Sequence, residues 1–65
     1  MTKLEFKAEV RKAMTLKGWN YKELAEATGY THGTIQTMMS DDDKLSSDAI
    51  KKIAEVMGIK KKLPI

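Results

Sequence analysis

The stretch from residue 20 to residue 39, NYKELAEATGYTHGTIQTMM, constrains the fold of this chain more than any other segment. It holds two short amphipathic runs, each preceded by a residue that caps helices. Asn20 with Glu23 three residues later forms a capping box, and the Thr31 hydroxyl can accept from free N–H groups of a second helix. Gly29, between the runs, suits the left-handed turn that ends a helix. The stretch therefore predicts two helices joined by a tight turn.

Two further helices are predicted from their ends. One begins at Thr2 and stops at Gly18, and the other is capped by Ser46 or Ser47 and closed by Gly58. No segment alternates at period two, so we expect an all-α fold of four helices, or five. The apolar residues that recur at helical spacing, and so predict the buried faces, are Phe6, Val10, Ala13 and Met14, then Leu24 and Ala25, then Ile35 and Met38, and finally Ile50, Ile53, Ala54 and Met57.

Length and composition exclude several classes of protein. A chain of 65 residues without cysteine has neither disulfides nor thiolate metal sites, and must be stabilised by packing. No apolar run reaches the roughly 18 residues of a membrane span, and no secretion signal is present, so we expect a cytoplasmic protein without a membrane partner. No nucleophile is paired with a base, and His32 has no companion ligands. We therefore expect no enzyme, no cofactor and no metal.

Charge is distributed unevenly along the chain, whose net charge is +3. Residues 1–18 carry five basic and two acidic side chains, residues 19–43 one and five, and residues 44–65 six and two. A basic balance is compatible with a nucleic-acid partner. However, the positive charge lies before and after the two-helix stretch, and not on it.

Ala25 is small where the two helices must approach, Gly29 supplies the turn, and Ile35 is an apolar lock between the helices. The pattern I-x-x-I-A-x-x-M-G-I follows at a fixed distance, from Ile50 to Ile59. On these residues the chain resembles the Cro and phage-repressor family of helix-turn-helix proteins, also called the Xre family. The resemblance implies a repressor-like domain at residues 1–59, with the motif at 20–39, and a basic tail at 60–65.

By resemblance, residues 32–39 are a recognition helix for the major groove of DNA. The implied function is that of a bacterial or phage-encoded transcriptional regulator that binds an operator in double-stranded DNA, and a homodimer is compatible with it. Gln36 suits adenine, the Thr37 methyl suits thymine, and His32 can donate to guanine N7 or to phosphate. The implied base-reading residues are His32, Gly33, Gln36 and Thr37, and the implied phosphate contacts are Asn20, Tyr21, Lys22, Thr31, Thr34, Ser40 and Lys44.

The acidic run at residues 41–43 supports an alternative function. No Lys or Arg occurs between Lys22 and Lys44, and carboxylates beside DNA repel phosphate. A chain with this fold can instead bind another protein, for example a repressor, through an acidic loop at residues 40–43. Met39 stands where the family often has a polar residue, so we expect it to be exposed as an adaptable apolar contact.

Overall fold

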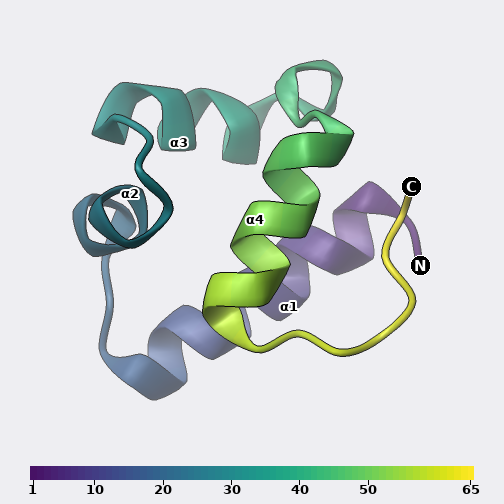
Figure 1. Cartoon of the computed structure of the whole chain (residues 1–65), viewed down its shortest axis with the longest axis horizontal. Helices are drawn as coiled ribbons and strands as arrows, with labels where there is room; N and C mark the ends of the chain where they lie inside the picture. The colour runs from purple at the N-terminus through teal and green to yellow at the C-terminus, as the bar shows by residue number, and fades with distance from the viewer.

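The computed structural model of the protein describes all of residues 1–65 and contains four α-helices and one short 3₁₀ helix. It has no strands, so the all-helical prediction is confirmed. Figure 1 shows α4 crossing the middle of the molecule, with α3 at one end and the second half of α1 at the other. The elements are α1 (Lys3–Lys17), α2 (Tyr21–Thr28), α3 (His32–Ser40), η1 (Asp42–Lys44) and α4 (Ser47–Met57).

The helices begin at the predicted caps. In the capping box of α1, the Glu5 backbone N–H donates to the Thr2 hydroxyl at 3.1 Å, and the Thr2 N–H donates to the Glu5 carboxylate at 2.8 Å. This backbone donor, followed by the Thr2 side chain, lowers the pKa of Glu5 below its ordinary value of 4.5. Asn20 makes the equivalent box for α2, and Ser46 rather than Ser47 caps α4.

The helices end in two ways. Glycines in the left-handed conformation close α1, α2 and α4, with φ between 71° and 81° at Gly18, Gly29 and Gly58. In contrast, α3 ends at Asp41 in extended backbone and runs directly into η1. The acidic segment predicted as a loop at residues 40–43 is therefore not a plain loop, because Ser40 is the last residue of α3 and Asp42–Lys44 form one turn of 3₁₀ helix.

The core contains the predicted buried faces, except that Ala13 is only half-buried. One prediction was wrong: Met39 is only 2% exposed, and it belongs to the core. Met39 lies four positions after the buried Ile35 and next to Met38, so it falls on the buried face of α3 and enters the core. Leu45, which follows η1, is buried in the same core. The core members are Phe6, Val10, Met14, Leu24, Ala25, Ile35, Met38, Met39, Leu45, Ala49, Ile50, Ile53, Ala54 and Met57.

The two ends of the chain lie side by side (Figure 1). The Met1 amine donates to the carbonyl oxygen of Lys62 at 3.3 Å, and Ile59 and Leu63 pack against the core. The residues after α4 therefore run back across the molecule toward the start of α1. None of the helices is both long enough and apolar enough to span a lipid bilayer.

Candidate nucleic-acid interface

The junction of α2 and α3 is a three-residue turn held by buried contacts. Ala25 and Ile35 are both buried, and the Gly29 N–H donates to the carbonyl oxygen of Ala25 at 2.9 Å. Thr28 is buried as well, and its hydroxyl lies 2.8 Å from the carbonyl oxygen of Leu24, to which it donates. The two hydrogen bonds close the end of α2, and the burial of Ala25 on α2 and Ile35 on α3 agrees with the small residue and the apolar lock predicted between the helices.

One side of α3 is exposed and polar. His32, Gly33, Gln36 and Thr37 are all exposed, whereas Ile35, Met38 and Met39 on the other side are buried. Positions four apart lie above one another on a helix. The structure therefore brings the four residues predicted to read bases onto one exposed face, centred on the N-terminal half of α3.

Local hydrogen bonds occupy the hydroxyl groups of this helix. Thr31 accepts from the Thr34 N–H at 3.1 Å and donates to the Thr34 hydroxyl at 2.8 Å. The hydroxyl of Thr37 donates to the carbonyl oxygen of Gly33 at 3.0 Å, which leaves its methyl group and an acceptor lone pair for a ligand. His32 and Gln36 make no such bonds. Their donors and acceptors are the uncommitted polar groups of the face.

Gly33 lies in the first turns of α3, where glycine costs up to about 1 kcal/mol relative to alanine. Its φ is not positive, and a Cβ atom added to it would meet nothing within 4 Å. Neither the backbone nor the packing requires a glycine here. The missing side chain instead leaves the backbone of α3 open to anything that approaches this face.

Three of the predicted phosphate contacts lie at the start of α2. The Asn20 side chain already accepts from the Glu23 N–H at 3.0 Å, and Tyr21 is half-buried against the core. Lys22 is exposed and supplies the positive charge of this end. A helix N-terminus adds partial positive charge, so the start of α2 suits an anion.

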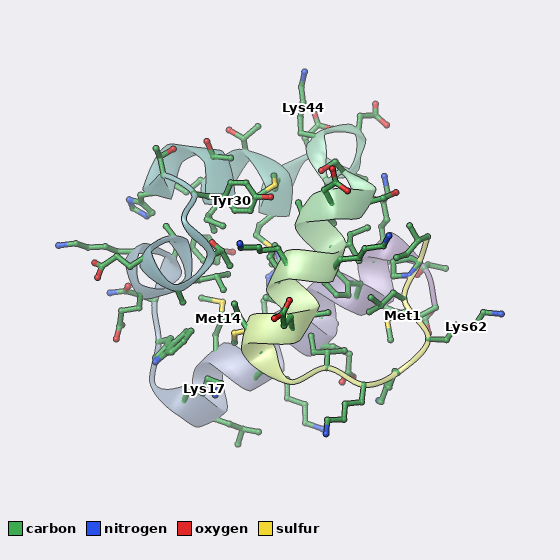
Figure 2. The ribbon with its side chains drawn as sticks, in the orientation of Figure 1. Met1, Met14, Lys17, Tyr30, Lys44 and Lys62 are labelled. Carbon is green, nitrogen blue, oxygen red and sulfur yellow. The ribbon has the colours of Figure 1, made fainter.

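The remaining predicted phosphate contacts lie along α3 and η1. Thr31, Thr34 and Ser40 are exposed, and the Ser40 hydroxyl donates to the carbonyl oxygen of Thr37 at 3.2 Å. Lys44 extends away from the fold beside η1 (Figure 2). Lys22 and Lys44 are thus the only two lysines among the predicted contacts, and they lie on different elements.

The acidic turn at residues 41–43 is largely tied into the fold. The carboxylate of Asp42 pairs with Lys7 of α1, whose side chain is only 9% exposed, and the Asp42 carbonyl oxygen accepts from Lys3 at 3.0 Å. The carboxylate of Asp41 accepts from the backbone N–H of Asp43 at 3.0 Å and so caps η1. Of the three carboxylates, only that of Asp43 has no partner in the chain.

We did not predict this attachment, although the sequence contains a signal for it at Lys7. This lysine lies three residues before Val10 and seven before Met14, and therefore falls within the buried stripe of α1. A lysine on a buried face requires a counter-charge, because an unpaired buried charge is strongly unfavourable. The acidic run is the densest group of carboxylates in the chain and hence the natural source of that counter-charge.

A family model described as helix-turn-helix matches residues 10–62, which is most of the chain. The chain belongs to the Cro/C1-type helix-turn-helix family. This helix-turn-helix protein therefore has the domain of a DNA-binding regulator, and α2 and α3 are its motif. Searches of curated proteins and of solved structures found no match to the chain.

Proposed function

We propose that this protein is a sequence-specific transcriptional regulator that inserts α3 into the major groove of an operator. His32, Gly33, Gln36 and Thr37 would face the base edges. The observation that carries the proposal is the exposed polar face of α3, on which His32 and Gln36 have no hydrogen-bond partners within the chain. A glutamine amide offers a donor and an acceptor side by side, which matches the major-groove edge of adenine.

Phosphate contacts in this proposal come from a small number of groups around α3. They are the lysines Lys22 and Lys44, the N-terminus of α2, and the polar side chains Asn20, Tyr21, Thr31, Thr34 and Ser40. Because α3 itself carries no Lys or Arg, we expect few counterions to be released on binding. The affinity should then depend weakly on salt, with a logarithmic slope of about −2 if the two lysines dominate.

The direct test is Gln36→Ala. Binding of the variant to a DNA site selected from random sequences should be weaker by about 1 to 3 kcal/mol, and the preference at one base pair should relax. Its affinity for random DNA should change little. Thr15→Ala, on the exposed side of α1, is the control and should leave both affinities unchanged. Fluorescence anisotropy at several salt concentrations measures both.

Two results would contradict the proposal. Equal losses on selected and random DNA would make Gln36 a positioning residue and remove it from the bases. Absence of DNA binding by the unmodified protein at about 50 mM salt, where the electrostatic term is strong, would exclude the operator function. A size measurement beside the titration determines whether a homodimer binds, as a two-fold symmetric operator requires.

The alternative function, docking of a protein on the acidic residues 40–43, stays a prediction. In the acidic turn, two of the three carboxylates are already engaged, because Asp42 is paired with Lys7 and Asp41 caps η1. Only the Asp43 carboxylate is without a partner there. The turn therefore offers one unpaired carboxylate to a basic partner, where the sequence suggests three.

A further inference from the structure

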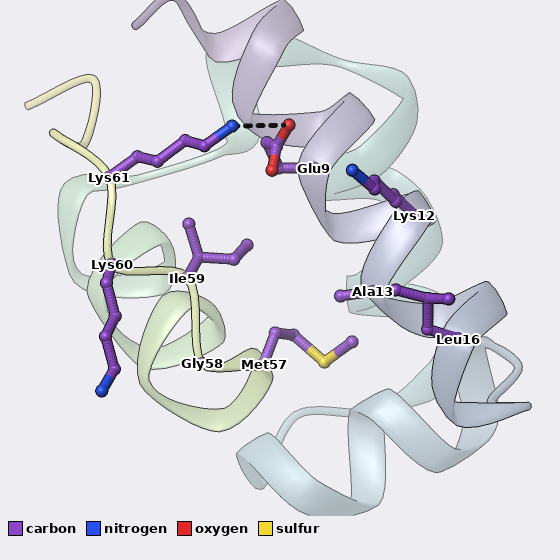
Figure 3. A pocket seen from close by; sticks show the side chains of 9 residues that line it. All are labelled: Glu9, Lys12, Ala13, Leu16, Met57, Gly58, Ile59, Lys60 and Lys61. Carbon is purple, nitrogen blue, oxygen red and sulfur yellow. Dashed lines mark ion pairs between the residues drawn. The ribbon is translucent and has the colours of Figure 1, made fainter.

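A groove lies between α1 and the end of α4 with the residues that follow it, and its volume is about 450 Å³ (Figure 3). Its apolar surface comes from Ala13 and Leu16 on one wall and from Met57 and Ile59 on the other. Leu16 is 79% exposed, more than any other large apolar side chain of the protein. A concave apolar surface of this size falls in the range of ligand sites, roughly 300 to 1,000 Å³.

Lysines surround this apolar surface. Lys12 lines the α1 wall, and Lys60 and Lys61 line the opposite wall. Glu9 is the only carboxylate of the groove, and it is already paired with Lys61 at 3.3 Å. Neither Lys12 nor Lys60 has an ion pair, but the Lys60 side chain extends away from the apolar floor, whereas Lys12 lies on the α1 wall (Figure 3). The rim therefore keeps an excess of positive charge at Lys12.

The groove is separate from the proposed DNA interface. All of its residues belong to α1, to the end of α4 or to the segment after α4, and none belongs to α2 or α3. In Figure 1, α3 lies at one end of the molecule, and the second half of α1 with the end of α4 lies at the other. An occupant of the groove would therefore leave α3 free.

The chemistry of the groove selects among possible occupants. A second copy of this chain would bring the same lysines to the contact, and like charges directly opposed are unfavourable. Nucleic acid would meet the lysines but would leave the apolar floor uncovered. A small molecule would remain largely exposed against a wall formed by Leu16, whereas tight small-molecule sites bury most of their ligand.

We propose that this groove binds an acidic segment of another protein, with apolar side chains on the floor and a carboxylate at Lys12. An amphipathic helix in a groove presents its apolar anchors in this way, at spacings of three and four residues. The domain would then contact DNA through α3 and a protein partner through the opposite end. The inference does not depend on DNA binding, because the two surfaces share no residue.

The test uses the whole chain and a fluorescein-labelled peptide of about 14 residues, a length at which a helix is marginally stable. The peptide consists of glutamate and alanine with two leucines four positions apart, which places both leucines on one face. Two control peptides replace the leucines by alanine or the glutamates by lysine. We expect the first peptide to bind. In NMR spectra of the protein, its addition should change the backbone amide chemical shifts of Ala13, Leu16, Gly58 and Ile59, but of no residue in α3.

Variants of the protein separate the apolar and electrostatic contributions. Leu16→Ala should weaken the peptide about tenfold, whereas Leu4→Ala, another exposed leucine on the same helix but outside the groove, should have no effect. Lys12→Gln should weaken it up to about fivefold at low salt, and Glu9→Gln should strengthen it. Lys52→Gln, on the exposed side of α4, is the matched control for charge.

Three results would overturn the proposal. One is the absence of amide shifts at about 1 mM peptide. Another is equal binding of the leucine-free peptide, which would reduce the effect to charge alone. The third is a set of shifts centred on α3 or η1 instead of the groove. Fluorescence anisotropy with operator DNA, measured with and without the peptide, tests DNA binding separately. A failure of DNA binding through α3 can then be distinguished from a failure of peptide binding in the groove.

Discussion

The two ends of α3 differ in what holds them. At its N-terminal end, His32 and Gln36 are exposed, and the hydrogen bonds of the neighbouring threonines are local. At its C-terminal end, Met38 and Met39 are buried, and the next turn is attached to α1 through the pair of Asp42 and Lys7. The N-terminal end is held on one side, by the buried Ile35, and presents its other side to solvent, whereas the C-terminal end is buried and continues into a turn that is attached to α1.

The two ends of α3 have different roles in the proposed function: the N-terminal end determines ligand specificity, and the C-terminal end helps to orient the helix. Side chains at the N-terminal end are under few demands from folding, so their identity is free to be set by a ligand. The C-terminal end sets the direction of the helix through contacts with residues more than thirty positions away in the chain. Substitutions at the N-terminal end of this short helix should therefore change ligand binding. Substitutions at its C-terminal end should change the free energy of unfolding.

The largest expected effect is at the C-terminal end of α3. Met39→Ala removes a buried side chain and leaves a cavity, so we expect the free energy of unfolding to fall by about 2 to 5 kcal/mol. Gln36→Ala, one turn earlier on the exposed face, should change it by less than about 0.5 kcal/mol. Urea denaturation measures both. Similar losses for the two variants would show that the ends are not held differently.

The attachment of the acidic turn to α1 should have the next largest effect. Asp42→Asn leaves Lys7 buried without its counter-charge, and because Asp42 is half-exposed we expect a loss of about 1 to 2 kcal/mol. Asp43→Asn, whose carboxylate has no partner, is the matched control and should cost less than about 0.5 kcal/mol.

A double-mutant cycle sharpens the assignment of that loss. In a Lys7→Met background the buried charge is absent, so Asp42→Asn should cost little. A loss that persisted in this background would mean that Asp42 stabilises the turn by itself and not through α1.

A smaller effect of opposite sign is expected at the N-terminal end of α3. Gly33→Ala should raise stability by about 0.5 to 1 kcal/mol, because the site is helical and the space for a methyl group is open. If α3 approaches base edges through this position, the same methyl group should weaken DNA binding. If Gly33→Ala instead lowered the stability measured by thermal unfolding, a packing constraint would exist at the N-terminal end of α3.

The smallest effect concerns the first turn of α1, between the two lysines, Lys3 and Lys7, that hold the acidic turn. The folded-state pKa of Glu5 is lowered by the Thr2 N–H, so its contribution to stability is present above pH 4.5 and is lost as the pH falls below that value. Glu5→Gln should be slightly less stable than the unmodified protein at neutral pH. The difference should shrink on acidification; a constant difference down to about pH 3 would contradict this account.

Local sequence signals predicted most of the elements correctly. The capping boxes at Thr2 and Asn20 and the glycines at Gly18, Gly29 and Gly58 mark helix ends that the structure confirms. The apolar spacing predicted most of the core, because burial of one helix face is a periodic property of the chain. The assignments of base-reading and phosphate-binding residues stay predictions, although the first group is now known to share an exposed face.

The sequence by itself determined four helices, their ends and the family, since caps, glycines and apolar periods act within a few residues. Helical spacing also places Lys7 and Met39 on buried faces, and only the tertiary structure decided that the acidic run pairs with Lys7 and folds into η1. The sequence alone suggests a free negative patch, and the pairing of the run with Lys7 becomes visible only when α1 packs beside it. Each of these outcomes depends on contacts between distant segments, whose charges and surfaces meet only after the helices pack.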